Sequence, residues 1–186
     1  MRTETNAMSG LRIFDDNAPG APVLDTGDAT EIAAHLATIG VRFERWDSPV
    51  TLPPDAEADA ILDAYRPYLD RLMGETGAGS ADVIKMTPDH PQAGTLREKF
   101  LNEHSHTEDE VRFFVSGAGH FVMHTEGKVF DALCTKGDLI SVPANIKHWF
   151  DAGERPDFIA LRIFTDQSGW VAHFTGDAIS ARFPVT

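Results

Sequence analysis

The chain has 186 residues, 42% of them hydrophobic, and its 16 basic and 29 acidic side chains give a formal net charge of −13. That charge would repel a phosphate backbone, and the basic residues are scattered among carboxylates, so nucleic-acid binding is not expected. No apolar run approaches the roughly 18 residues that cross a bilayer, and the first residues lack the apolar stretch of a secretory signal. Cys134 is the only cysteine, which excludes an intrachain disulfide. We therefore expect a cytoplasmic protein that does not associate with membranes.

The first 79 residues are predicted to mix strands and helices. Residues 1–10 are polar and show no periodic pattern, so we expect them to be disordered. The elements predicted after them are strands at 11–14 and 41–46, a short helix at 30–40 that Thr30 could cap, and a longer helix from 55 to about 73. Pro67 lies inside the longer helical pattern and is expected to kink or split that helix. Residues 11–79 are interpreted as an α/β decoration of the main domain.

The remainder of the chain has the rhythm of an antiparallel β protein. Short β-type runs recur at intervals of roughly 8–12 residues, with turns rich in glycine and proline between them. The predicted strands are 83–86, 111–115, 119–124, 128–133, 138–142, 148–151 and 158–164. This pattern favours a sandwich or barrel over βαβ units. We therefore expect one mainly β domain over 1–186, with its barrel core at 80–177.

Four chemically active side chains follow one another at even spacing: His104, His106, Glu110 and Arg112. In a β-strand, side chains two residues apart share a face. If the strand keeps its register, these four point into a common cavity, whereas Val111 and its odd-numbered neighbours pack on the other face. The sequence therefore predicts one polar, functional face and one structural face.

His148 is a further candidate for the same site, 38 residues beyond Glu110. That separation is the length of three or four strands with their turns, which can return a side chain across a barrel. Three imidazoles and one carboxylate suit a first-row divalent ion. Four protein ligands leave two positions of an octahedral ion open for a chelating substrate, unlike a closed structural site. We therefore predict one metal ion per chain, bound in a site that also binds substrate.

A simpler interpretation exists for each of these residues. An isolated His-x-His pair is more often two solvated histidines, and an isolated arginine more often forms an ordinary ion pair. The matching parity of Glu110 and the presence of His148 favour the metal site. The remaining histidines lack such partners and are interpreted as structural; they are His35, His90, His120, His124 and His173.

Two segments resemble the motifs of the cupin superfamily. His104-x-His106-x3-Glu110-x6-Gly117 resembles the first motif, and Gly137-x5-Pro143-x4-His148 resembles the second. The resemblance implies a cupin barrel, that is, a double-stranded β-helix or jelly roll.

A finer resemblance is to the acireductone dioxygenase family of methionine salvage. The run KFLNEHSHTEDEVRFF at 99–114 is similar to that family, and so are 137–143, 148–151, 162–164 and 169–176. The likeness is dense over 96–177 and looser in the N-terminal third. It implies a dioxygenase that acts on 1,2-dihydroxy-5-(methylthio)pent-1-en-3-one and O₂. With Fe²⁺ the family forms 4-methylthio-2-oxobutanoate and formate, and with Ni²⁺ it forms 3-methylthiopropionate, formate and carbon monoxide.

The resemblance also implies roles for individual residues. Arg112 would stabilise the substrate dianion, Glu103 resembles a residue linked to metal incorporation, and Asp109 resembles one linked to relaying conformational change. The metal ligands would be His104, His106, Glu110 and His148. Phe100, Phe150 and Trp170 are expected to line an apolar pocket for the methylthio tail.

Two other functions stay open on the sequence. One is a different cupin oxygenase or isomerase that uses the same ligands on another chelating substrate. The other is a non-catalytic cupin that binds a metal or small ligand and works through a partner protein. Arg112 beside an open metal site favours an enzyme with a small-molecule substrate, and we expect a monomer. The choice between Fe²⁺ and Ni²⁺ and the role of the N-terminal region are left open.

Overall fold

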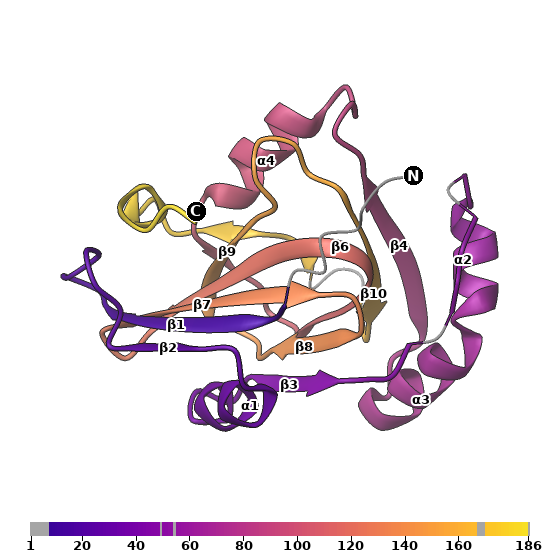
Figure 1. Ribbon diagram of the computed structural model, residues 1–186, viewed down its shortest axis with the longest axis horizontal. Helices are drawn as coiled ribbons and strands as arrows, with labels where there is room; N and C mark the ends of the chain where they lie inside the picture. The colour runs from indigo at the N-terminus through magenta and orange to yellow at the C-terminus, as the bar shows by residue number, and fades with distance from the viewer. Residues whose placement is uncertain (1–7, 49, 54, 167–169, 186) are drawn as a thin grey trace.

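The computed structural model describes residues 8–48, 50–53, 55–166 and 170–185. Its strands form one antiparallel sheet that folds back on itself, with the helices on the outside (Figure 1). The strands are β1 (Gly10–Asp15), β2 (Leu24–Thr26), β3 (Arg42–Arg45), β4 (Ser80–Met86), β5 (His104–Ser105), β6 (Glu110–Thr125), β7 (Lys128–Thr135), β8 (Asp138–Val142), β9 (Lys147–Asp151), β10 (Phe158–Phe164) and β11 (His173–Phe174). This is the mainly β jelly-roll architecture that the sequence predicted. Within the described ranges, no helix is long and apolar enough to span a membrane.

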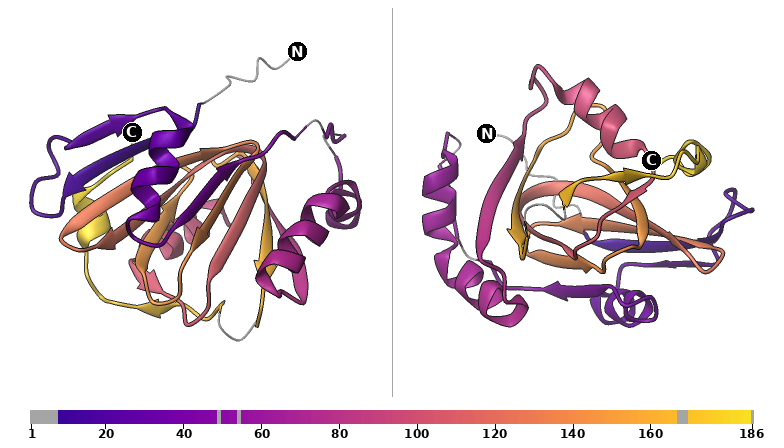
Figure 2. Two further views of the ribbon diagram at one scale, coloured as in Figure 1. Left: turned by 90° about the horizontal axis from the view of Figure 1, so that it is seen from below. Right: turned by 180° about the vertical axis from the view of Figure 1, so that it is seen from behind.

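The long strand β6 joins the two halves of the sheet. One half has the order β11-β5-β9-β6-β7-β1-β2, and the other has the order β3-β8-β6-β10-β4. The two halves face each other and enclose the barrel interior, as the views from below and behind show (Figure 2). Because β6 takes part in both halves, side chains from its first part and from β5 and β9 can meet in that interior.

A β-bulge in β6 replaces the turn that was predicted between two separate strands. Phe114 is paired with Ala160 and Ser116 with Ile159, so Val115 is the extra residue. Gly117 follows with a φ of 70°, and a Cβ there would lie 1.9 Å from the carbonyl oxygen of Asp157. Only glycine accepts both conditions at low cost. The bulge bends the strand from one half-sheet into the other and exchanges the faces of odd and even residues.

The N-terminal segment is part of the sheet, which differs from the expected decoration. β1 pairs with β7, and β3 pairs with β8. Ser9 is 3% exposed and donates a hydrogen bond to the Asp138 carboxylate. The prediction of disorder over 1–10 is therefore wrong for Ser9 and Gly10, whereas residues 1–7 lie outside the described part of the chain. At the other end, buried Ile179 and Phe183 extend the packed structure beyond the predicted limit at 177.

The helices lie on the outer surface of the barrel (Figure 1). They are α1 (Ala29–Ala37), α2 (Ala58–Ala64), α3 (Arg66–Thr76), α4 (Ala93–Leu101) and the 3-10 helix η2 (Ile179–Arg182). Asp28, rather than Thr30, caps α1 by accepting from two backbone amides. The predicted long helix is split into α2 and α3, with Pro67 in the first turn of α3, where its missing N–H costs nothing.

α4 was not predicted, because it lacks a broad apolar face. Its sequence is AGTLREKFL, and Ala93 is its only buried residue. It packs on β9 and places Arg97 against the buried Asp151 carboxylate, with N–O distances of 2.8 and 3.0 Å. This two-point contact compensates for the weak amphipathicity. The helix therefore brings its last turn to the open end of the barrel.

The parity of β6 divides the apolar core into an inner and an outer cluster. Before the bulge, odd-numbered Phe113 packs outward with Tyr65 and Leu69 of the helices. Even-numbered Phe114 points inward, and after the bulge the inward position passes to odd-numbered Phe121. The aromatic rings of Phe114 and Phe121 thereby line the barrel interior next to the polar residues at the start of β6.

Candidate metal centre and its cavity

His104, His106, Glu110 and His148 converge in the barrel interior. One potential ligand atom from each lies within 4.8 Å of the other three, and all four side chains are buried. His104 on β5 is paired directly with His148 on β9, and Glu110 opens β6. The sequence argument assumed a continuous strand through all these residues, which is wrong in detail. β5 ends at Ser105, and a short loop carries His106 back toward Glu110.

Each of the three imidazoles is oriented by a backbone carbonyl. A carbonyl oxygen only accepts hydrogen bonds, so the Nδ1 atom that contacts it must carry the proton. The Nε2 atom of each ring is then the one directed into the site, and the carbonyl fixes the ring orientation; Nε2 of His148 donates to Glu110, so an ion that binds there would replace that proton. The acceptors are the carbonyls of Asn102 (2.6 Å) for His104, Ile146 (2.8 Å) for His148 and Val171 (3.2 Å) for His106.

Glu110 is the negative centre of this cluster. Its Oε2 atom lies 2.8 Å from Nε2 of His148 and 3.2 Å from Nε2 of His106, and its Oε1 atom lies 2.9 Å from Arg112. Burial raises the pKa of this carboxyl group, but Arg112 and His148 outweigh burial and hold it well below its usual range. Burial lowers the pKa of His104 to about 4, so this imidazole is neutral at physiological pH. A carboxylate beside a neutral imidazole provides the lone pairs that a divalent cation requires.

Arg112 lies beside the cluster, and its two terminal nitrogens, Nη1 and Nη2, differ in their contacts. Burial lowers the pKa of Arg112 to about 10, which keeps the guanidinium charged near neutral pH. Its Nη2 atom donates to Glu110, whereas Nη1 is buried and has no hydrogen-bond partner among the residues that the structure describes. The indole ring of Trp170 covers the guanidinium, with the ring centroid 4.4 Å from Cζ, and within the described ranges the indole Nε1 is also without a partner. Nη1 of Arg112 and Nε1 of Trp170 are therefore two buried donors beside the site that a bound ligand could satisfy.

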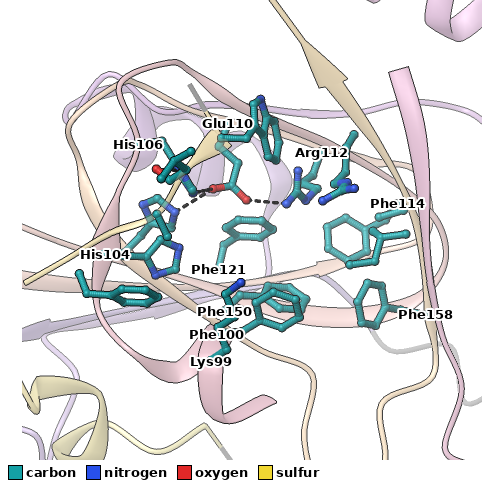
Figure 3. A pocket seen from close by; sticks show the side chains of 18 residues that line it. Lys99, Phe100, His104, His106, Glu110, Arg112, Phe114, Phe121, Phe150 and Phe158 are labelled. Carbon is teal, nitrogen blue, oxygen red and sulfur yellow. Dashed lines mark hydrogen bonds and ion pairs between the residues drawn. The ribbon is translucent and has the colours of Figure 1, made fainter. Parts of the chain in front are cut away.

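These residues open onto a cavity of about 480 Å³ with two chemically different walls. One wall carries the four candidate ligands and Arg112, and the opposite wall is aromatic (Figure 3). Phe150 contacts the ring of Phe100 at 6.2 Å and that of Phe121 at 5.0 Å between centroids. Gly119 makes room for Phe150, since a Cβ there would lie 2.4 Å from its Cζ atom. Phe100, Phe150 and Trp170, the residues expected in the apolar pocket, all line this cavity, but Trp170 lies against Arg112 and His106 rather than in the aromatic wall of Phe100 and Phe150.

Glu103 lies outside the candidate ligand cluster and connects other segments to it. Its carboxylate is 1% exposed and accepts hydrogen bonds from His124 (2.7 Å) and from the Thr175 hydroxyl (2.7 Å). Its backbone carbonyl accepts from the Thr175 amide at 3.0 Å. β11 is thereby held beside β5, and Phe174 lies against His104 with 5.7 Å between ring centroids. His124, interpreted from sequence as structural, thus contacts a residue next to the site.

Asp109 lies in the loop before β6 and reaches the turn between β8 and β9. Its Oδ1 atom accepts a hydrogen bond from the Ala144 amide at 3.0 Å. The next amide in that turn, from Asn145, donates to the carbonyl of His106 at 2.8 Å. Asp109 therefore joins the segment that carries His106 to the turn that leads into His148. This is a supporting position, away from the candidate ligand atoms.

Several residues that line the cavity were not identified from the sequence, and they include Lys99, Phe114, Phe121, Phe158, Arg162 and Phe174. Phe114 could have been found, because it shares the parity of Glu110 and Arg112. Phe121 has the opposite parity and reaches the cavity only because of the bulge at Val115. Lys99 lies on the unpredicted helix α4, so no sequence period indicated its position.

Fold and site together define a metal-binding cupin. The donors fit a divalent cation, since three oriented imidazoles and a deprotonated carboxylate converge beside an open cavity. Because the candidate ligands face an open cavity, the site resembles a metal centre that binds substrate and differs from a closed structural site.

The chain belongs to the ARD/ARD′ family, whose profile matches residues 10–172. It is 79% identical over 178 residues to an acireductone dioxygenase of Acidiphilium cryptum (strain JF-5), an alignment that covers 96% of this chain and 99% of that protein. It is 62% identical over 177 residues to an acireductone dioxygenase of Granulibacter bethesdensis, with coverage of 95% and 99%. Among solved structures it is similar to the acireductone dioxygenase from Bacillus anthracis with a cadmium ion in its active centre. That match has a TM-score of 0.77 and 30% identity, and it covers 90% of this chain and 99% of the other.

Proposed function

We propose that this protein is a metal-dependent acireductone dioxygenase that cleaves 1,2-dihydroxy-5-(methylthio)pent-1-en-3-one with O₂. The observation that carries the proposal is the cavity itself, in which four candidate ligands and a half-paired arginine face an aromatic wall. An enediol that chelates through two oxygens and carries an apolar thioether tail matches both walls. The identity to curated acireductone dioxygenases supports the same activity.

In this proposal His104, His106, Glu110 and His148 hold one divalent ion per chain. The bound ion supplies Lewis acidity and a template for a chelating enediol. The backbone carbonyls that fix the imidazole tautomers keep the Nε2 atoms directed at one point. The cadmium ion in the Bacillus anthracis relative supports a cation at this position.

Arg112 is proposed to bind the oxygen-bearing end of the substrate as a dianion. Its charge is permanent near neutral pH, and its Nη1 atom is a donor to which no described residue offers an acceptor. A charge-assisted hydrogen bond in a cavity shielded from water favours the doubly deprotonated enediol over the monoanion. That electron-rich dianion is the form that reacts with O₂. Trp170 holds the guanidinium plane in place by stacking on it.

The aromatic wall is proposed to bind the methylthio tail. Phe100, Phe150 and Phe121 present edges and faces to the cavity, and a thioether sulfur makes favourable contacts with such rings. This wall also excludes water from the reacting end of the substrate. Glu103 and Asp109 are proposed to support the site from outside, through their contacts to β11 and to the β8–β9 turn.

The metal is proposed to be Fe²⁺ or Ni²⁺, with products that depend on which one is bound. With Fe²⁺ we expect 4-methylthio-2-oxobutanoate and formate. With Ni²⁺ we expect 3-methylthiopropionate, formate and carbon monoxide. Both product sets account for all atoms of the substrate and one O₂.

The test is to prepare metal-free protein, load it separately with Fe²⁺ and Ni²⁺, and analyse the products from acireductone under O₂. The matched control is His106→Ala, which should lose most of the bound metal and the turnover while the β fold persists in circular dichroism. Stoichiometric metal in that variant would contradict the ligand assignment. Identical products from the two loaded forms, or no turnover by either, would favour another cupin oxygenase or a non-catalytic metal-binding cupin.

We further propose that the enzyme works as a single-domain monomer in the cytoplasm. The participation of β1 and β3 in the same sheet as the barrel strands supports a single domain over 1–186. Light scattering coupled to size-exclusion chromatography tests the oligomeric state, for which the expected mass is that of one 20.4 kDa chain.

A further inference from the structure

The charged side chains that line the cavity differ in whether they form an ion pair with another residue. Four of them, Lys99, Glu110, Arg112 and Arg162, reach its surface. Glu110 and Arg112 pair with each other at 2.9 Å, and Arg162 pairs with Asp82. Among the ion pairs of the described residues, none involves Lys99. Lys99 is therefore the cavity cation whose charge no described carboxylate neutralises.

Lys99 also differs from the two arginines in its position. Arg112 has 13% of its side chain exposed and lies beside Glu110, inside the barrel. Lys99 is exposed, lies in the last turn of α4, and is the neighbour of Phe100 in the aromatic wall. Figure 3 shows its amino group turned toward the cavity, beside Phe100 and Phe150. The unpaired charge therefore lies at the rim of the cavity, where the lining residues Val171 and Phe174 are exposed as well.

The net negative charge of the protein makes an unpaired cation at the cavity rim important for an anionic ligand. The chain has a formal net charge of −13, so the surface as a whole repels anions. Exposed charges act mainly within a Debye length, about 10 Å at 0.1 M salt. A single cation at the rim therefore changes the local potential at the entrance without altering the field of the whole molecule.

We propose that Lys99 captures the acireductone anion at the entrance of the cavity and positions it for transfer to the metal and Arg112. The inference rests on the proposed function, because it takes an anionic enediol as the substrate. Lys99 makes no contact with the reacting oxygens in this role. It acts on the encounter and on weak initial binding, so its contribution belongs to kcat/KM rather than to kcat.

The size of the effect follows from one solvent-exposed unit charge. In water, a charge pair near contact changes an equilibrium by about two- to fivefold at low ionic strength. Lys99→Met should therefore lower kcat/KM by about that factor and leave kcat within about twofold of the original. Lys99→Glu changes the charge by two units, so its loss should be about four- to 25-fold. Lys99→Arg keeps the charge and should retain kcat/KM.

The experiment compares these variants with a matched control on the same metal-loaded enzyme. Lys136→Met removes another exposed lysine, one that does not line the cavity, and it should leave kcat/KM unchanged. All variants are assayed between about 10 and 300 mM ionic strength, where the differences among them should shrink as salt screens the charge. Anaerobic titration with acireductone provides a readout without turnover, in which Lys99→Glu should raise the Kd. Metal content and Tm should be the same in all variants.

Three results would overturn the inference: an unchanged kcat/KM in Lys99→Glu, an equal loss in Lys136→Met, or a loss confined to kcat and insensitive to salt. Each of them is distinguishable from failure of the proposed function, because that failure appears in the unaltered protein as absence of acireductone turnover. Active unaltered enzyme with an unaffected Lys99→Glu variant would remove only the role of Lys99.

Discussion

At Arg112, the geometry separates a catalytic role from a structural one. The Nη2 atom pairs with Glu110, which is what an ordinary buried ion pair requires. The Nη1 atom has no partner in the described part of the chain, although a buried donor left unsatisfied costs roughly 1–3 kcal/mol. In a purely structural arginine, both terminal nitrogens would be expected to donate hydrogen bonds within the protein. The unpaired donor is therefore the feature at residue scale that points to an anionic ligand.

Arg112→Ala should keep the metal and lose most of the activity. A charge-assisted contact to the dianion is worth roughly 1.5–3 kcal/mol, which corresponds to about a ten- to hundredfold loss of kcat. The bound ion still neutralises Glu110 in the variant. Metal content, Tm and turnover should be measured on one sample, together with the absorbance change of acireductone on anaerobic binding, which should weaken. Lys99→Met is a suitable comparison, since it also removes one cavity cation. Normal turnover with a lowered Tm would show that Arg112 serves only the fold.

The sequence located the polar residues of the site better than their supports. Residue type and motif spacing identified His104, His106, Glu110 and His148, because few combinations of side chains can bind a divalent ion. The carbonyls that orient the imidazoles belong to backbone atoms, and no residue type encodes them. The contact between Glu103 and His124 joins the segment before β5 to the end of β6, so single-strand parity could not show it.

At the scale of elements, the predictions failed where contacts between distant segments, rather than the local sequence pattern, decide the structure. The glycines at 117 and 119 indicated a turn, but they serve a bulge and the packing of Phe150 within one continuous strand. α4 was missed because no broad apolar face marks it in the sequence: it is attached to the barrel by a few scattered apolar contacts and by the ion pair of Arg97 with Asp151. β8 and β10 were predicted at their observed limits, since their apolar runs are short and bounded by turns.

β11 is the element whose attachment is easiest to test. It has only two residues and pairs with the two residues of β5, so its own ladder is weak. Thr175 supplements that ladder through its hydroxyl contact with Glu103. Thr175→Val should therefore increase amide hydrogen exchange over residues 170–175, because a buried carboxylate loses a donor. Thr175→Ser retains the hydroxyl and should behave like the original protein.

This prediction also distinguishes local from global effects. Exchange in β7 should be the same in both variants, because β7 is paired along its length with β1 and β6 and takes no part in the described contacts of Glu103. Equal exchange over 170–175 in Thr175→Val and Thr175→Ser would mean that the backbone bond from Thr175 to Glu103 suffices to hold β11.

At the scale of the whole molecule, the candidate metal site ties together strands that are distant in sequence. β5, the loop after it, β6 and β9 each contribute a candidate ligand, and β11 and the β8–β9 turn are attached to the same residues. Such a site does not exist in the unfolded chain, so ion binding favours the folded state. The barrel nevertheless has large apolar clusters of its own, which predicts a folded metal-free protein.

Removal of the metal should therefore lower Tm without unfolding the protein at room temperature. Free ion at about 100 times its Kd stabilises the native state by about 2.7 kcal/mol. For a chain of this length, each kcal/mol shifts Tm by about 2–4 °C, so the expected decrease is about 5–11 °C. His106→Ala is the control, because its Tm should no longer respond to added ion. If metal raised Tm equally in both proteins, the ion would be stabilising the fold from another site, and the four side chains that converge in the barrel would not be its ligands.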